Sequence, residues 1–168
     1  MRRVQETLRA IGTADEHFAH ATPDNEPSSV AYYNATRHAM CTGQAFTDLA
    51  LLGRDFGEAS DRLTAAVAGC PEGHTRVRAS CLAKLSSLTM ATGDPLQAAA
   101  IGNEALEVAG TLRSHRTTDN LRDLFRHAAA HQDLSEVADL RDRIRTLVCT
   151  DNLENPPLDR PLDDSPGT

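Results

Sequence analysis

The sequence predicts an all-α protein made of antiparallel helical hairpins that stack on one another, and three observations lead to this expectation. Hydrophobic residues make up 40% of the chain but aromatic residues only 4%, with no Trp. Ala and Leu must therefore fill the core, which suits closely packed helices better than the branched and aromatic surface of a sheet. Helix-start signals recur at a fixed spacing. Apolar residues also recur at helical intervals, most clearly in the series Leu134, Val137, Leu140, Ile144 and Leu147.

The recurring helix-start signal is an Asp followed three residues later by Glu or Gln. The pairs are Asp55–Glu58, Asp94–Gln97 and Asp133–Glu136, with 39 residues from each Asp to the next. An Asp at this position caps a helix by accepting hydrogen bonds from free amides of its first turn. Pro95 follows the second Asp at the first helical position, where its missing amide costs nothing. Because one thin hairpin cannot bury its own apolar face, a repeat at constant spacing indicates stacked units.

The signals divide the chain into a helical domain over 1–150 and an acidic tail over 151–168. We expect a first helix over about 2–20, followed by a Pro-containing loop. The three hairpins are expected to pair helices over about 28–52 with 56–69, 75–92 with 95–110, and 116–131 with 134–149. Ser28 or Ser29 is the expected cap of the first of these helices, and we consider a bend at Thr42–Gly43. The Pro and Asp content of the tail predicts disorder there.

Charge and hydropathy exclude several classes of protein. The net charge is −7, of which the tail supplies −4 through five carboxylates and one arginine. The remainder shows no basic stripe, so we expect no direct nucleic-acid binding by this chain. Apolar runs are only a few residues long, so no segment is expected to span a membrane. Glu6 interrupts the stretch after the basic N-terminus, so no signal-peptide core is present and a cytoplasmic location is the default expectation.

The second unit carries a family resemblance. Gly93-Asp94-Pro95-Leu96-Gln97-Ala98, followed by Ala105, resembles the Gly…Ala…Ala core of a tetratricopeptide repeat, and the first unit matches with Phe56, Ala59, Leu63, Ala66 and Pro71. The resemblance implies a right-handed superhelix whose concave face is lined by the first helix of each hairpin. Three features depart from the family pattern: Gly53 is one residue early, Val137 replaces a small Ala, and the unit exceeds 34 residues.

A narrower resemblance covers roughly residues 8–148. Tyr32-Tyr33-Asn34-Ala35, Gly43-Gln44-Ala45-Phe46-Thr47-Asp48-Leu49, Gly93-Asp94 and Ser114-His115-Arg116 are similar to the C-terminal repeat region of bacterial XRE-type helix-turn-helix regulators. In that family the repeats are thought to sense a peptide, a small molecule or a partner protein. About 27 residues precede the first unit here, too few for a DNA-binding domain. The resemblance thus implies a fragment of such a transcription regulator, or a standalone relative.

No pattern in the sequence indicates catalysis. The nucleophile elbow, the Walker loop and the dinucleotide-binding glycine motif are all missing from it. The pairs His17–His20 and His127–His131 could each place two imidazoles on one helix face, but no third metal ligand is marked. The cysteines form no C-x-x-C pair, and we expect each to be a small buried hydrophobe: Cys41, Cys70, Cys81 and Cys149. We predict no enzyme activity, no cofactor and no metal.

The architecture instead predicts a groove that binds a protein or peptide. The residues expected to line it are Gln44, Asp48, Lys84, Ser87, Arg122 and Arg126, with Tyr33 and Arg37 beside them. Such a groove would be mixed in sign and basic toward the third unit. The alternatives are a scaffold that dimerises through the apolar ends of the array, or a helical protein that binds a small molecule or metal. The acidic tail is also a candidate occupant of the groove, opposite Arg122 and Arg126.

Overall fold

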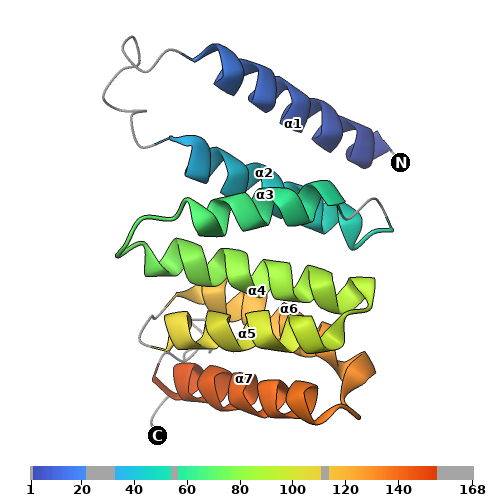
Figure 1. The fold of residues 1–168 in the computed structure, drawn as a ribbon, viewed down its shortest axis with the longest axis vertical. Coiled ribbons are helices and arrows are strands. Elements are labelled where there is room, and N and C mark those ends of the chain that lie inside the picture. The colour runs from blue at the N-terminus through green and yellow to red at the C-terminus, as the bar shows by residue number, and fades with distance from the viewer. Residues whose placement is uncertain (1, 22–32, 54–56, 111–113, 155–168) are drawn as a thin grey trace, which may run out of the picture.

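A computed structural model describes residues 2–21, 33–53, 57–110 and 114–154, and in these ranges the chain is all-α with no strand. Within these described ranges, seven α-helices and one 3₁₀ segment follow one another and stack along the long axis of the molecule (Figure 1). The elements are α1 (Arg2–His20), α2 (Ala35–Ala50), α3 (Gly57–Ala68), α4 (Thr75–Thr92), α5 (Pro95–Ala109), α6 (His115–His127), η2 (Ala128–His131) and α7 (Ser135–Glu154). No helix in the described ranges is long and apolar enough to cross a bilayer.

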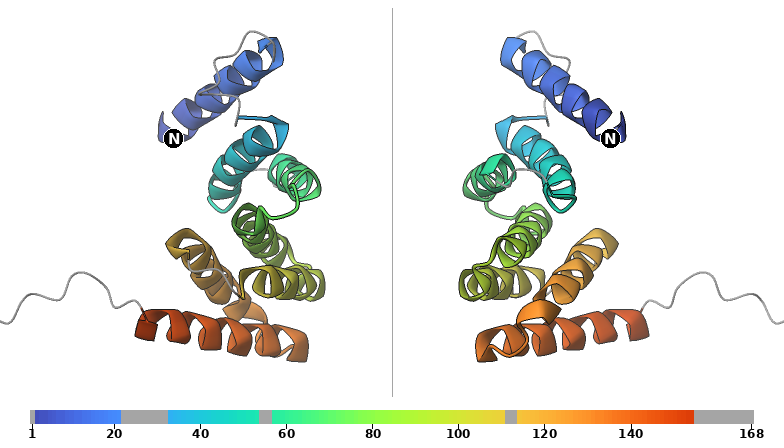
Figure 2. Two further views of the ribbon diagram at one scale, coloured as in Figure 1. Left: turned by 90° about the vertical axis from the view of Figure 1, so that its left-hand side faces the viewer. Right: turned by 90° about the vertical axis from the view of Figure 1, so that its right-hand side faces the viewer.

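Consecutive helices pack in pairs, and the pairs contact one another through specific helices. The pairs are α2 with α3, α4 with α5, and α6 with α7. Between pairs, α4 contacts α2, α3 and α6, and α5 contacts α7. Figure 2 accordingly shows α2 and α6 on one side of the molecule and α3 and α5 on the other. Helix α4 lies in the middle and is surrounded by neighbours.

The start of α2 differs from the sequence expectation. Residues 28–32 lie outside the described ranges, and the helix begins only at Ala35. Asn34 is its cap, because its Oδ1 accepts a hydrogen bond from the Arg37 amide at 3.0 Å. The helix is continuous through Gly43. A Cβ on Gly43 would lie 3.2 Å from the Leu63 backbone nitrogen, and this glycine instead allows α2 and α3 to approach closely.

The three expected Asp caps have different outcomes. The predicted cap at Asp94 is confirmed, since its Oδ1 accepts a hydrogen bond from the Gln97 amide at 3.0 Å and Pro95 occupies the first turn of α5. Asp55 lies outside the described ranges. The third helix start was predicted one residue too early. Helix α7 begins at Ser135, and the Leu134 carbonyl accepts its first bond, from the Ala138 amide at 2.9 Å.

The ends of the third hairpin also differ from the prediction. The expected helix over 116–131 is α6 up to His127, and η2 completes it as a tighter 3₁₀ turn. Helix α7 continues to Glu154, four residues past the predicted domain boundary at 150. Residues 155–168 of the predicted tail lie outside the described ranges.

The largest apolar cluster joins α4, α5, α6 and α7. Its bulky members are fully or nearly fully buried, and alanines fill the spaces between them. The bulky residues are Leu82, Met90, Leu106, Leu121, Leu124, Val137, Leu140 and Ile144. Three residues of the apolar series predicted for 134–148 belong to this core, and Leu134 and Leu147 pack at its edge. Smaller clusters, built around Leu63 and Leu88, continue the burial from α4 to α2 and α3.

Helix α1 is attached by a polar network. Asp15 is at its centre: Oδ1 accepts from His38 Nε2 at 2.7 Å, and both oxygens accept from Arg62 at 2.8 Å. Arg62 also donates to Thr42 Oγ1 and to Glu58. The pKa of Asp15 is lowered from 3.8 to about 2, and the largest cause of this shift is the hydrogen bonding from Arg62. One carboxylate thus joins α1 to both α2 and α3.

Aromatic rings complete the attachment of α1. The Phe18 ring stacks on the His38 imidazole with their centroids 4.4 Å apart. Tyr33 lies edge-on to Phe18, and its hydroxyl is 3.1 Å from His38 Nδ1. His38 is therefore held on both of its nitrogens and on one face. Ile11 is the one large apolar side chain among the described residues of α1 that is buried.

Candidate partner-binding surface

Of the residues predicted to bind a partner, Gln44 lies between helices. Its Nε2 donates to Ser80 Oγ at 3.4 Å, and Asn120 Nδ2 donates to the same oxygen at 2.7 Å. Ser80 and Asn120 are buried, so these side chains form a polar ladder from α2 through α4 to α6. Hydrogen bonds of this kind fix how neighbouring helices align. These contacts link α2, α4 and α6, and they place the Gln44 amide between helices rather than on a free surface.

The predicted residues Asp48, Lys84 and Ser87 are also engaged within the array. Lys84 Nζ lies 2.8 Å from Asp48 Oδ1, which joins α4 to α2. Ser87 was expected to be exposed, and this prediction was wrong: it is 2% exposed, and its hydroxyl donates to the Ala83 carbonyl at 3.0 Å. The reason is the central position of α4, which has neighbours on several sides and little free face.

Tyr33 and Arg37 lie at the start of α2 and not beside the other predicted residues. Tyr33 is 38% exposed and takes part in the attachment of α1. Arg37 is exposed and lines a cavity of about 160 Å³ between the start of α2 and the connection from α3 to α4. This cavity is separate from the one that Arg122 and Arg126 line.

Arg122 and Arg126 line a cavity of about 290 Å³ between α6 and α7. In Figure 2 the two helices diverge from their connection, and the C-terminal end of α7 extends past α6. The floor of the cavity is apolar, and a third arginine comes from α7. The other lining residues are Phe125, Ile144, Arg145, Val148 and Cys149.

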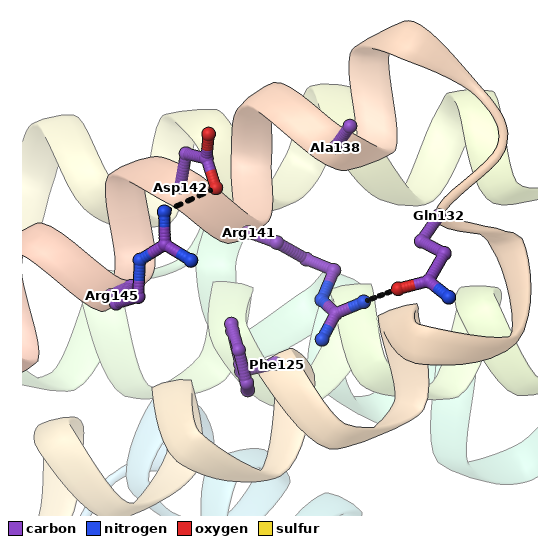
Figure 3. A pocket seen from close by; sticks show the side chains of 6 residues that line it. All are labelled: Phe125, Gln132, Ala138, Arg141, Asp142 and Arg145. Atoms are coloured by element: carbon purple, nitrogen blue, oxygen red, sulfur yellow. Dashed lines mark hydrogen bonds and ion pairs between the residues drawn. The ribbon is translucent and has the colours of Figure 1, made fainter.

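A second cavity, of about 170 Å³, is shown in Figure 3, and it shares the lining residues Phe125 and Arg145 with the first. Arg141 lies in it with its guanidinium 4.4 Å from the Phe125 ring centroid, a cation–π contact. One of its terminal nitrogens donates to Gln132 Oε1 at 2.5 Å. Its Nε is buried and has no hydrogen-bond partner in the described structure. The two cavities share Phe125 and Arg145, and together they are called here the arginine groove, lined by Arg122, Phe125, Arg126, Gln132, Ala138, Arg141, Asp142, Ile144, Arg145, Val148 and Cys149.

Three of the four arginines of the groove form ion pairs with an Asp three residues earlier on the same helix. Arg122 lies 2.8 Å from Asp119, Arg145 lies 2.9 Å from Asp142, and Arg126 contacts Asp123. These pairs are partly exposed, and pairs of this kind contribute only about 0.5 kcal/mol or less. A ligand carboxylate with better geometry can therefore replace the Asp. The groove thus combines an apolar floor with guanidinium groups that a carboxylate can reach.

Sequence reasoning identified Arg122 and Arg126 but missed the rest of the groove. A signal was available in the sequence. Arg141 and Arg145 are four residues apart on one helix, as are Arg122 and Arg126 on the other, and each pair flanks an apolar position, Ile144 or Phe125. Two such stripes on paired helices predict a basic, apolar-floored seam.

The cysteines were expected to be small buried hydrophobes. Cys81 is fully buried, and burial raises the pKa of its thiol to about 12. Cys41 and Cys149 are exposed and Cys70 is half-buried, so the expectation that all four are buried was wrong. Cys149 lines the cavity between α6 and α7, and Cys70 lies in the connection between α3 and α4. In the part of the chain that the structure describes, no three metal-ligating side chains lie close enough together to hold a metal ion.

Comparisons with known proteins give no relative for this chain: no family model, no curated protein and no solved structure matches it.

Proposed function

We propose that this chain is a non-enzymatic binding module that holds a protein or peptide partner in the arginine groove. The observation that carries the proposal is the groove itself, an open depression with an apolar floor and four arginines. Protein interfaces combine a buried apolar centre with Arg at high frequency. The larger cavity, at about 290 Å³, is at the lower limit for small-molecule sites, which suits a few side chains of a peptide.

The proposal includes a tetratricopeptide-like arrangement and a regulatory role in a bacterial cytoplasm. The 39-residue repeat and the separation of α2 and α6 from α3 and α5 support the arrangement. The similarity to the sensing region of helix-turn-helix regulators supports the role. On this proposal the chain does not contact DNA, and the partner's presence in the groove is the signal.

The test is a capture experiment from a host lysate with two charge-reversal variants. Arg122→Glu/Arg126→Glu removes two arginines of the groove. Arg76→Glu/Arg116→Glu is the matched control, because both residues are exposed, near helix starts and outside every described cavity. We expect a partner that binds wild type and the control but not the groove variant. A partner held equally by all three proteins would reject the groove as the site.

Folding of the groove variant needs its own control, because Glu at these positions would face Asp119 and Asp123. The neutral variant Arg122→Gln/Arg126→Gln avoids this repulsion and should weaken capture in the same direction. Light scattering on the purified protein tests the alternative of a dimerising scaffold. If a stable dimer forms and Arg122→Gln/Arg126→Gln dissociates it, the groove binds a second copy of this chain.

A further inference from the structure

We propose that the chain's own segment 155–168 occupies the arginine groove and competes there with the partner. This inference rests on the proposed function, since it names a regulation of the same site. It starts from the described end of α7. The groove is lined by α7 residues up to Cys149, and the helix ends at Glu154, so the segment begins beside the groove.

The segment has the chemistry that the groove would recognise. It carries two leucines four residues apart, Leu158 and Leu162, and each is followed directly by an acid. Three carboxylates, Asp159, Asp163 and Asp164, oppose the single Arg160. The leucines match the apolar floor, and the carboxylates match guanidinium groups, which bind carboxylates through paired hydrogen bonds.

The length of the segment is sufficient. From Cys149 to Glu154 the helix advances by about 8 Å, at 1.5 Å per residue. An extended chain covers about 3.3 Å per residue, so the residues after Glu154 can reach back over that distance several times. Leu158 lies only four residues beyond the helix end. Both leucines can therefore contact the floor without any change in α7.

Tethering makes weak contacts effective. A short connection gives a local concentration on the order of 1 mM, so a segment with an intrinsic Kd of about 0.1 mM would occupy the groove about nine-tenths of the time. A free partner must then bind about tenfold more tightly to reach the same occupancy. High salt would weaken the contact because it rests partly on exposed charges. On this proposal, only a partner with sufficient affinity displaces the segment from the groove.

Cys149 provides a direct readout in the full chain. Its thiol is exposed in the described structure and lines the groove, whereas the exposed Cys41 on α2 lies elsewhere. We would measure the rate at which iodoacetamide modifies each cysteine, by mass spectrometry. If the segment occupies the groove, Cys149 reacts about tenfold more slowly in wild type than in Leu158→Ser/Leu162→Ser. Cys41 should react at the same rate in both proteins.

Control variants separate occupancy from general effects. Leu96→Ser replaces a leucine that is 52% exposed on α5, and it should leave the Cys149 rate unchanged. Asp159→Asn/Asp163→Asn/Asp164→Asn should raise the rate at low salt, as should Arg122→Gln/Arg126→Gln. Asp61→Asn, which changes an exposed acid on α3, should leave the Cys149 rate unchanged. Circular dichroism confirms that each variant is folded.

Two outcomes would overturn the proposal. Equal Cys149 rates in wild type and both tail variants would show that the segment does not cover the groove. Protection that rises with protein concentration would show that a second copy covers it instead. Either result leaves the proposed function standing if partner capture still requires Arg122 and Arg126. If capture ignores those arginines while Cys149 is protected by the segment, the proposed function fails and competition with a partner fails with it.

Discussion

Helices α4–α7 and helix α1 are held in the molecule by different kinds of contact. The four helices share a large cluster of leucines and alanines, most of them fully buried. Helix α1 buries Ile11 and otherwise depends on Asp15 and on the stacked rings of Phe18 and His38. Burial of apolar surface acts over the whole cluster, whereas a polar network depends on each partner. We therefore expect the two regions to respond separately to mutation and to pH.

The largest expected effect is in the α4–α7 core. Leu140→Ala should lower the free energy of unfolding by about 3 kcal/mol, because Leu140 is fully buried and leaves a cavity. Its side chain also fills the space above Gly102, where a Cβ would lie 2.8 Å from Leu140 Cδ2. Urea unfolding should show a lower midpoint with an unchanged slope. The control Leu96→Ala, at an exposed leucine, should change stability by about 0.5 kcal/mol or less.

A smaller and local effect is expected at the attachment of α1. Asp15→Asn removes the charge that His38 and Arg62 share, and we expect α1 to open more easily by about 1 kcal/mol. Amide hydrogen exchange should become about fivefold faster in residues 2–20, with little change in α4–α7. Equal acceleration throughout the chain would show that α1 and the core unfold together, and would contradict the expectation that the two regions respond separately.

The dependence on pH sharpens the same contrast. The pKa of Asp15 is lowered from 3.8 to about 2 in the folded protein, so its ionised form stabilises the attachment of α1. This contribution is fully present above about pH 4 and is lost as the pH falls through about 2. The difference in α1 exchange between wild type and Asp15→Asn should therefore be constant near pH 5 and disappear toward pH 2. A difference that persists at pH 2 would contradict the assigned role of Asp15.

The smallest effect is expected at the ion pair between Asp48 and Lys84. Asp48 is well exposed, and double-mutant cycles on such pairs give about 0.5 kcal/mol or less. We expect a coupling of that size between Asp48→Asn and Lys84→Gln, and less at high salt. A coupling above about 1 kcal/mol would mean that this pair contributes more to the array than the exposed geometry indicates.

The sequence was informative where several local signals agreed. Asp94 is a cap, as predicted, because Pro95 and Gln97 both favour a helix start at that point. Asp133 lacks such a proline, and the helix starts at Ser135. The apolar series of α7 correctly predicted Val137, Leu140 and Ile144 in the core. Periodicity thus identified the helices and their buried faces, while helix starts depended on hydrogen bonds between nearby residues.

Exposure and site geometry could not be predicted in the same way. Ser87 is buried because α4 has neighbours on several sides, which no local pattern in α4 expresses. The arginine groove is lined by residues of both α6 and α7, so it depends on how the two helices lie against each other and not on either helix alone. Gly43 allows close packing against Leu63, which no pattern within α2 predicts. Each of these outcomes depends on a partner helix.

The polar ladder has a consequence for how this protein can evolve. Ser80 Oγ accepts hydrogen bonds from Gln44 in the preceding hairpin and from Asn120 in the following one. At the repeat spacing of 39 residues, the position equivalent to Ser80 in the third unit is Asp119. A gene that lost or duplicated the middle unit would place a different side chain against each donor. The units share a spacing of 39 residues but not the side chains that join them, so the third unit does not supply the Ser80 hydroxyl that these two donors contact in the middle unit.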